Sequence, residues 1–455
     1  MKNVLIICLL LLNQNFILAE SSSYDYSSYT ATSKDKSLTS QTVECTTSGQ
    51  SAVYITTGGI TITDSTITKS GDIASENTED SEFYGVNAAV LVQKGSLTMT
   101  GGTITTSARG GNALVATNDG SVTISGTTIT STGSGSARGL HATYGGTIKA
   151  DSVTITTQYG SCATLATDRG EGTVSCSNCI LTTNGAGSPI IYSTGDITMT
   201  SSTGTSNGAQ AVVVEGKNTA TIKSSTIKCT GSGNNRNDEC GVLIYQSMSG
   251  DADTGTSTFT CDSSSIEIVS SSGVYSSAPM FYVTNTAANI DLTGCTFTYG
   301  SGTFLNVSEG DWGTSGSNGG TVTMTLTDQE IEGDIVVGSS SSLTLKLVNS
   351  SIKGKINNAK TAGTLAITLD ADSEITLTGD SYYTSLSNAD STGSNIDTGN
   401  YTFSATDGSS SSDNKNNDDD DDDDSIIQIS TSSSNSLNAY KNTLFGFALM
   451  ILLFF

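Results

Sequence analysis

The feature that most constrains this fold is a short phrase that recurs six times between residues 95 and 230. The copies begin at Gly95, Gly120, Gly146, Gly172, Gly195 and Ala220, so successive starts lie 25, 26, 26, 23 and 25 residues apart. A repeat of this length is typical of a solenoid, in which each copy buries its apolar face by stacking on its neighbours. The length of 455 residues therefore fits one extended repeat domain.

Each copy alternates apolar residues with threonine and serine. Counted from the start, the second, fourth and ninth positions hold Leu97, Met99 and Ile104 in the first copy. Such alternation indicates short strands with one buried face. A turn rich in Gly, Ser and Asn then leads to a third apolar run, such as AVVVE from Ala211. Three strands per copy predict an all-β chain, a parallel β-helix of about twelve coils over residues 53–405.

The two ends of the chain differ from the repeat. Residues 1–19 have the basic start, apolar run and small final residue of a secretory signal. Residues 20–52 form a Ser/Tyr-rich segment, expected to cover the first coil or to stay flexible. Residues 406–442 read as a Ser/Asn/Asp-rich stalk that includes the aspartate run 418–424.

The apolar tail of residues 443–455 is shorter than the roughly 20 residues that a membrane-spanning helix needs. Together with a polar spacer and small residues at Ser432, Ser433 and Ser434, it predicts a glycosylphosphatidylinositol (GPI) attachment signal. A short membrane-anchoring tail and a packed terminal strand remain the alternatives. The expected location is the outer face of the plasma membrane, where Asn306, Asn349 and Asn400 become candidate N-glycosylation sites.

Nine cysteines become eight once the signal is removed. Cys229 and Cys240 bracket an insertion, so a disulfide between them is predicted to pin an enlarged loop. Cys176 and Cys179 form a C-x-x-C sequence, but Cys176 falls on the buried column. This pair is expected to pack in the core or to bond to a neighbouring coil, instead of serving zinc or redox chemistry.

The formal net charge is −25, of which the aspartate run contributes seven units. Nucleic acids and anionic lipid surfaces are therefore poor partners. The aspartate run is interpreted as a self-repelling extended stalk, with calcium binding as the alternative, and no other cofactor is expected.

The sequence offers little for catalysis. Polysaccharide lyases need a strong base near acidic calcium ligands, and glycoside hydrolases need carboxylates a few ångströms apart. The only histidine, His141, falls within a third strand and is expected to be structural. Three pairs are interpreted as solvated turn charges: Asp168 with Arg169, Asp251 with Asp253, and Glu309 with Asp311.

Threonine recurs on both sides of the buried ninth position. The tenth position is predicted to hold Thr68, Thr105, Thr130, Thr156, Thr182, Thr205 and Thr230. Since these side chains flank a buried residue, they should point outward and form a flat array of hydroxyl and methyl groups. Such an array suits an ordered lattice, such as ice or a crystalline glycan, although threonine is also favoured simply because it suits a strand.

Several phrases resemble a known family. ATDRGEGTVS from Ala166, LIYQSMSGDADTGTSTFT from Leu243 and GDWGTSGSNGGTVT from Gly310 are similar to the adhesin-like right-handed parallel β-helix proteins of bacteria and archaea, of pectin-lyase-like fold. The resemblance covers residues 53–405 and implies a right-handed solenoid and carbohydrate binding. It implies no active site, and the GPI-type tail departs from the wall attachment of that family.

The combined hypothesis is a lipid-anchored, non-catalytic adhesin-like rod whose partner is a glycan or another cell-surface ligand. A polysaccharide lyase or hydrolase is the alternative, and an ice- or lattice-binding protein is the second.

Overall fold

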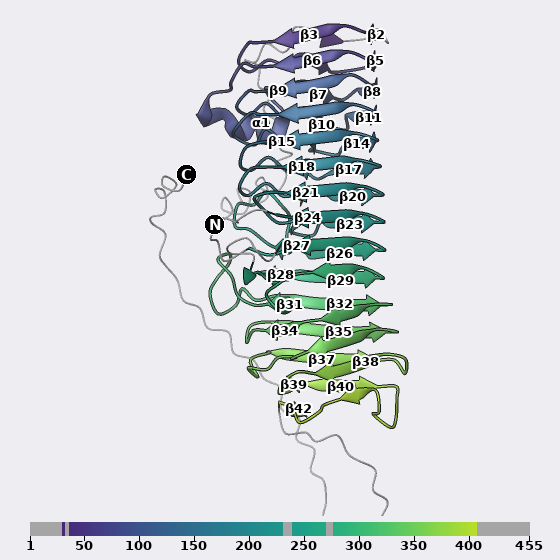
Figure 1. Ribbon diagram of the computed structural model, residues 1–455. Helices are drawn as coiled ribbons and strands as arrows, with labels where there is room; N and C mark the ends of the chain where they lie inside the picture. Colours follow the sequence, from purple (N-terminus) through teal and green to yellow (C-terminus); the bar gives the residue numbers. More distant parts are fainter. Residues whose placement is uncertain (1–29, 32–35, 231–238, 270–275, 407–455) are drawn as a thin grey trace, which may run out of the picture. The chain divides into compact units, whose positions relative to one another are not determined.

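The chain forms a right-handed parallel β-helix (Figure 1). This is a computed structural model that describes residues 30–31, 36–230, 239–269 and 276–406. Most coils contribute one strand to each of three long parallel sheets, here named A, B and C. The predicted order of strands within a coil is confirmed: positions two and four lie in sheet B, position nine in sheet C and the third apolar run in sheet A.

Sheet A has twelve strands. They are β1 (Thr30–Ala31), β4 (Val53–Ile55), β7 (Val90–Gln93), β10 (Leu114–Thr117), β13 (Leu140–Ala142), β16 (Leu165–Thr167), β19 (Ile191–Ser193), β22 (Val212–Glu215), β25 (Val242–Tyr245), β28 (Phe281–Thr284), β31 (Thr303–Val307) and β34 (Asp334–Val337).

Sheet B has fourteen strands. They are β2 (Lys36–Thr39), β5 (Gly59–Thr63), β8 (Ser96–Thr100), β11 (Ser121–Ser125), β14 (Gly146–Asp151), β17 (Gly172–Ser177), β20 (Asp196–Thr200), β23 (Thr219–Lys223), β26 (Thr256–Asp262), β29 (Ala287–Thr293), β32 (Thr321–Thr327), β35 (Ser342–Val348), β37 (Thr364–Leu369) and β40 (Ser385–Asn388).

Sheet C has ten strands, and two small sheets complete the C-terminal coils. Sheet C comprises β3 (Thr42–Cys45), β6 (Thr66–Lys69), β9 (Thr103–Thr106), β12 (Thr128–Ser131), β15 (Thr154–Thr157), β18 (Ile180–Thr183), β21 (Thr203–Ser206), β24 (Thr226–Cys229), β27 (Ser265–Ile268) and β30 (Thr296–Thr298). The small sheets comprise β33 (Glu330–Glu332), β36 (Ser351–Gly354), β38 (Glu374–Leu377) and β41 (Ile396–Asp397), and β39 (Ser381–Tyr383) with β42 (Phe403–Ala405).

The β-helix has more coils than the roughly twelve that the sequence predicts, because one coil at each end lacks the repeated phrase. At the start, β2 and β3 pair in parallel with β5 and β6. Residues 36–45 therefore form a coil themselves, whereas the sequence suggested a cap or a flexible segment there. At the other end β40 extends sheet B beyond β37.

The core is a set of stacked columns. In sheet B, Leu97 lies beside Val122, which lies beside Ile148, and each of these side chains is buried. Identical or similar residues thus contact each other from coil to coil, and a single apolar core runs through the rod. Burial of apolar area is the main source of folding free energy. This stacked core can therefore stabilise the fold although the chain has few charged residues.

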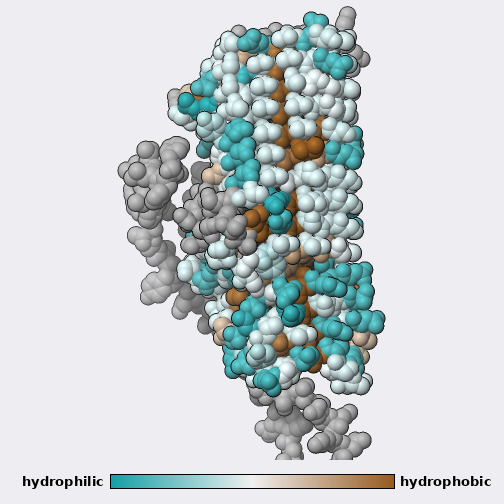
Figure 2. Space-filling model, viewed as in Figure 1, coloured by the Kyte–Doolittle hydropathy of each residue, from teal (hydrophilic) through white to brown (hydrophobic). Residues whose placement is uncertain are grey.

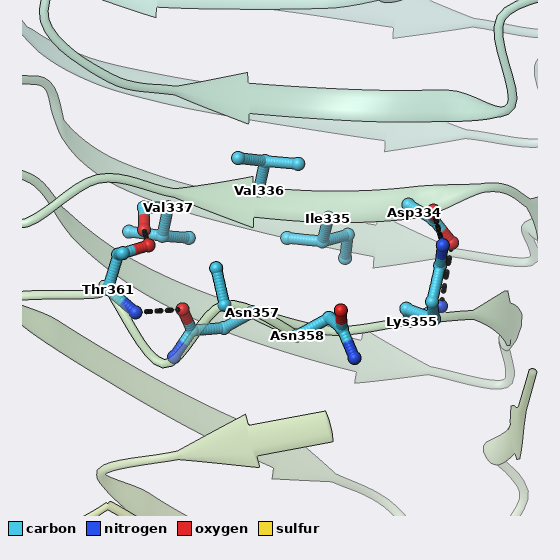
Figure 3. A pocket seen from close by; sticks show the side chains of 9 residues that line it. Asp334, Ile335, Val336, Val337, Lys355, Asn357, Asn358 and Thr361 are labelled. Atoms are coloured by element: carbon cyan, nitrogen blue, oxygen red, sulfur yellow. Dashed lines mark hydrogen bonds and ion pairs between the residues drawn. The ribbon is translucent and has the colours of Figure 1, made fainter. Parts of the chain in front are cut away.

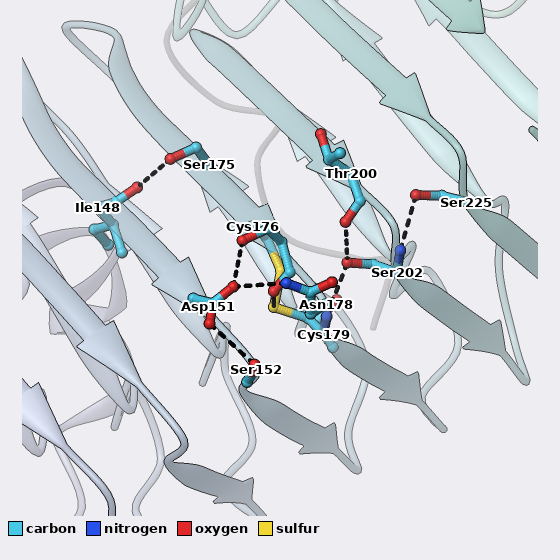
Figure 4. Close-up of a disulfide and its surroundings, with 12 residues drawn as sticks. Ile148, Asp151, Ser152, Ser175, Cys176, Asn178, Cys179, Thr200, Ser202 and Ser225 are labelled. Atoms are coloured by element: carbon cyan, nitrogen blue, oxygen red, sulfur yellow. Dashed lines mark hydrogen bonds between the residues drawn. A yellow bond between two sulfur atoms is a disulfide. The ribbon is translucent and has the colours of Figure 1, made fainter. Parts of the chain in front are cut away.

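The corner between sheets B and C is held by serine residues whose hydroxyls bond to the next coil. The backbone N–H of Cys179 donates to Ser202 Oγ at 2.9 Å, and that of Ser202 donates to Ser225 Oγ at 3.0 Å (Figure 4). Each hydroxyl in turn donates to a carbonyl of its own turn, as Ser202 does to Thr200. Buried backbone groups at this bend are therefore satisfied without water.

Two disulfides lie in the interior. Cys176 bonds to Cys179 within one turn, at the corner shown in Figure 4, so this pair does not bond to a neighbouring coil as one expectation had it. Cys261 of β26 bonds to Cys295, which follows β29 in the next coil. The second bridge therefore ties two adjacent coils together.

Sheet A ends at β34, where the stack changes its cross-section. A hollow of about 180 Å³ lies beside this strand, lined by Val336, Asn358 and Thr361 among others (Figure 3). Thr361 Oγ1 donates to the Val337 carbonyl at 2.7 Å, and Lys355 pairs with Asp334 at 2.9 Å. These contacts replace the strand that sheet A lacks in the following coil.

One helix interrupts the strands. It is α1 (Thr78–Tyr84), preceded by the 3-10 turn η1 (Ser75–Asn77), and it lies in the connection between β6 and β7. The helix ends at Gly85, whose φ of 72° is readily adopted only by glycine. Among the described residues, no helix has the length and apolar character needed to cross a bilayer.

Candidate functional site

The outward face of sheet C carries the predicted threonine array. The strand register places Thr68, Thr105, Thr130, Thr156, Thr182 and Thr205 side by side on six consecutive strands. All six side chains are half-buried, and their neighbours Ile67, Ile104 and Ile129 point into the core. We call these six residues, with the neighbouring column Thr66, Thr103, Thr128, Thr154 and Thr203, the threonine face.

Thr230 is not part of this face. The register pairs Thr205 with Lys228, so the tenth position of that coil is a lysine. The repeat in the sequence predicts that this copy starts at Ala220. Ala220 pairs with Ile197, however, so the copy begins two residues earlier, at Asn218. Thr230 instead lies just beyond β24, where its hydroxyl bonds to Asn207.

The array is regular in two directions. Parallel strands lie about 4.8 Å apart, and alternate residues on one strand lie about 6.7 Å apart. In the described part of the chain, the six tenth-position hydroxyls make no hydrogen bond to another protein group, so they are available to solvent or ligand. Ile180, with 56% of its surface exposed, is the one apolar residue in the neighbouring column.

The threonine face is uncharged. No charged residue occurs in β9, β12, β15, β18 or β21. Glu44 precedes the column at one end, and Lys228, paired with Glu267 at 3.1 Å, ends it at the other. In the view of Figure 2, residues of intermediate hydropathy dominate the middle coils, whereas hydrophilic residues gather at the lower end. The described side chains of this face and its two columns are threonines and Ile180, so no acidic, basic or thiol group stands among them.

Several strands of sheet A differ from those of sheets B and C because both of their faces are covered. Every residue of β10, β22, β25 and β28 is buried. Helix α1 packs beside these coils, where Asn112 Nδ2 donates to the Ser81 carbonyl at 3.0 Å. The outward residues Tyr245 and Tyr282 form a second apolar cluster, against which Trp312 packs. The sequence described these strands only as a third apolar run.

A buried polar cluster lies on this covered face. Arg138 Nη1 donates to Asp168 Oδ2 at 2.8 Å, and the two residues are only 7% and 4% exposed. The sequence suggested that Asp168 is a solvated turn charge, and this prediction is wrong. Burial raises the pKa of Asp168 to about 6, opposed by the Arg138 guanidinium. Arg169 does lie near the surface, paired with Asp251.

His141 is fully buried in the same cluster. Its Nε2 lies 2.7 Å from the carbonyl oxygen of Glu82, which can only accept, so Nε2 carries the ring proton. Arg138 Nη1 lies 3.3 Å from both ring nitrogens, and only the unprotonated Nδ1 can accept from it. Burial, with the neighbouring guanidinium, holds the pKa of His141 well below its usual value.

This burial predicts that acid destabilises the protein through His141. Below about pH 6.5 the unfolded chain binds a proton that the folded ring cannot, so stability present above that pH is lost as the pH falls. Relative to His141→Gln, the wild type should lose about 1.4 kcal/mol per pH unit. Asp168 has the opposite sign, since its raised pKa favours folding at low pH, but it is present in both proteins. Melting temperatures measured across this range test the prediction, and parallel curves for the two proteins would contradict it.

The remaining predicted residues are placed as follows. Asn349 and Asn400 are exposed, whereas Asn306 lies in β31 with its amide oxygen buried, so it is the least accessible of the three glycosylation candidates. Ser432, Ser433 and Ser434, the aspartate run and the two predicted terminal signals lie outside the described residues. Within the described ranges, no group of acidic, cysteine or histidine side chains is placed to hold a metal ion.

The predicted Cys229–Cys240 disulfide is wrong. Cys229 points into the main core, and burial raises the pKa of its thiol to about 12. Cys240 belongs to the separate cluster on the outer face of sheet A, together with Leu243 and Tyr282. The two side chains thus lie on opposite sides of the coil wall, a separation that sequence spacing does not reveal.

Comparisons of the chain with protein-family models, with curated proteins and with solved structures give no significant match. The class defined by the architecture is that of the right-handed parallel β-helix proteins.

Proposed function

We propose that the protein is a non-catalytic, adhesin-like molecule that contacts glycans at a cell surface through the threonine face. The observation that carries the proposal is the unbroken, uncharged register of threonines from Thr68 to Thr205. Polysaccharide chains in an ordered array present hydroxyl groups and C–H faces at regular spacing. A rigid sheet with matching groups can make many weak contacts to them at little entropic cost.

The proposed location is the outer face of the plasma membrane, reached through the N-terminal signal and held by a GPI anchor. The resemblance to adhesin-like β-helix proteins of pectin-lyase-like fold supports carbohydrate binding. The net charge of −25 opposes binding to nucleic acids and to anionic lipid.

The test is a binding assay of the full-length protein on insoluble polysaccharides and a glycan array, with product analysis of the same samples. Thr130→Tyr with Thr156→Tyr should weaken binding about tenfold or more, because two bulky rings break the flat face. Thr98→Tyr with Thr123→Tyr is the matched control, since both threonines are exposed on sheet B in the same part of the rod. Tyrosine suits strands, so folding should be preserved in both variants.

Equal loss of binding in both variants would contradict the proposal, as would the appearance of new reducing ends or unsaturated sugars. Thermal hysteresis that only the Thr130/Thr156 variant loses would assign the face to ice.

A further inference from the structure

A second surface lies where the turns from sheet C lead into sheet A. A cavity of about 240 Å³ opens between α1 and sheet A, and its lining includes Glu82, Ser136, Arg138, Ser161, Pro189 and Tyr192. Pockets for drug-sized ligands measure about 300 to 1,000 Å³, so this cavity suits one compact ring. Its walls come from α1, from the turns before β13, β16 and β19, and from β19 itself.

The cavity presents unused hydrogen-bonding groups. Arg138 is 7% exposed, and only its Nη1 bonds to Asp168 and His141. Its Nε and Nη2 donate to no other residue that the structure describes. Glu82 Oε1 accepts from Ser136 Oγ, while Oε2 has no partner among the described side chains and backbone. A buried guanidinium with free donors therefore shares a cavity with a carboxylate oxygen that is free to accept.

Tyr192 supplies a rigid apolar wall. Its hydroxyl donates to Glu215 Oε2 at 2.7 Å, and Glu215 also accepts from Tyr245 at 2.9 Å. These bonds fix the orientation of the ring, whose centroid lies 5.8 Å from Arg138 Cζ. Aromatic rings are amphipathic platforms that bury the apolar side of a ligand, and Pro189 adds a second apolar surface.

The charges of the cavity select among ligands. His141 is neutral, and Asp168 pairs with Arg138 Nη1 outside the cavity lining. The charged groups that a ligand meets in the cavity are therefore the Arg138 guanidinium and the Glu82 carboxylate. The carboxylate of Glu82 would repel an anionic ligand, and the guanidinium of Arg138 would repel a cationic one. A neutral ligand with several hydroxyls can use both groups, because each hydroxyl both donates and accepts.

We infer that this cavity binds one uncharged sugar residue, in the form of a pyranose ring. Two neighbouring hydroxyls donate to Glu82, a hydroxyl or ring oxygen accepts from Arg138, and the C–H face of the ring lies against Tyr192. This site does not depend on the threonine face, so it can hold whether or not the proposed lateral contact is correct.

The experiment is a titration of the full-length protein with sugars, in which binding is measured by calorimetry and by ligand-observed NMR. The ligands are methyl glycosides of neutral hexoses and pentoses, the matching uronates and the matching amino sugars, at millimolar concentrations. At least one neutral glycoside should bind more tightly than its uronate and its amino sugar. Glu82→Gln should weaken that binding about tenfold or more, because hydrogen bonds to a charged group are lost. Glu79→Gln, an exposed position on the same helix, should leave it unchanged.

A second pair of variants tests the role of the Tyr192 ring as the apolar wall of the cavity. Tyr192→Phe keeps the ring and should retain binding within a few fold, whereas Tyr192→Ala should abolish it. Absence of saturable binding by every neutral glycoside would overturn the inference, as would preference for uronate or equal affinity in the Glu82 and Glu79 variants. The Thr130/Thr156 variant should bind the monosaccharide normally. Its loss of polysaccharide binding alone would therefore report on the threonine face and not on this cavity.

Discussion

Replacing Arg138 with methionine is expected to lower the free energy of unfolding by about 3 to 5 kcal/mol. The substitution leaves the carboxyl of Asp168, which is 4% exposed, without the guanidinium that lies 2.8 Å away. An uncompensated buried charge must either stay ionised at a high desolvation cost or take up a proton. Chemical unfolding at neutral pH, followed by circular dichroism, measures the loss.

Two controls separate the charge effect from lost packing. Arg109→Met removes a surface pair with Asp72, with side chains 39% and 56% exposed, and should cost at most about 1 kcal/mol. The double variant Arg138→Met with Asp168→Leu removes both buried charges and should recover most of the lost stability. A double variant as unstable as the single one would show that the pair does not carry the effect.

Breaking the disulfide between coils should have the next largest effect. Cys261 and Cys295 are 34 residues apart, so replacing both with alanine should cost about 4 kcal/mol in the chain-entropy model. Replacing Cys176 and Cys179, which are only 3 residues apart, should cost about 2 kcal/mol or less. Urea unfolding without reductant compares the two variants, and equal losses would refute the assignment of the larger effect to the longer loop.

The regular part of the fold could be predicted from the sequence because one signal repeats at every coil. Alternation around Leu97 and Ile104 identifies two strands, and the recurring glycines separate the copies. The repeat is harder to recognise in copies where individual residues of the phrase have changed. The copy that holds Ala220 lacks its starting glycine, so its alignment slipped by two residues and moved Thr230 into the array. The first and last coils lack the phrase altogether, so they are not among the roughly twelve coils that the repeat predicts.

The cavity could not be predicted because its parts are not periodic. Glu82 comes from an insertion between two strands, and its helix is too short for a clear helical period. Asp168 stands beside Arg169 in a turn, where a solvated charge is the ordinary expectation. Its carboxylate is nevertheless buried, because it pairs with Arg138 of the preceding coil. Sequence distance hides this contact, since stacking brings together residues one repeat apart. The alternation of Tyr192 and Tyr245 with buried residues in their strands was a signal that could have indicated a covered outer face.

The bend between sheets B and C has a constant length, which sets where this protein can vary. The step from the sheet B column to the sheet C column is seven residues in successive coils, from Leu97 to Ile104 and from Val122 to Ile129. Insertions fall instead on the two sides of sheet A, such as the one that holds α1 and the one between β31 and β32. The serine hydroxyls at the constant bend leave no room for an added residue. New loops can therefore be added beside sheet A while the spacing of the threonine face stays the same. The loops beside sheet A are then the part of this protein that can diversify, and the threonine face is the part whose dimensions are fixed.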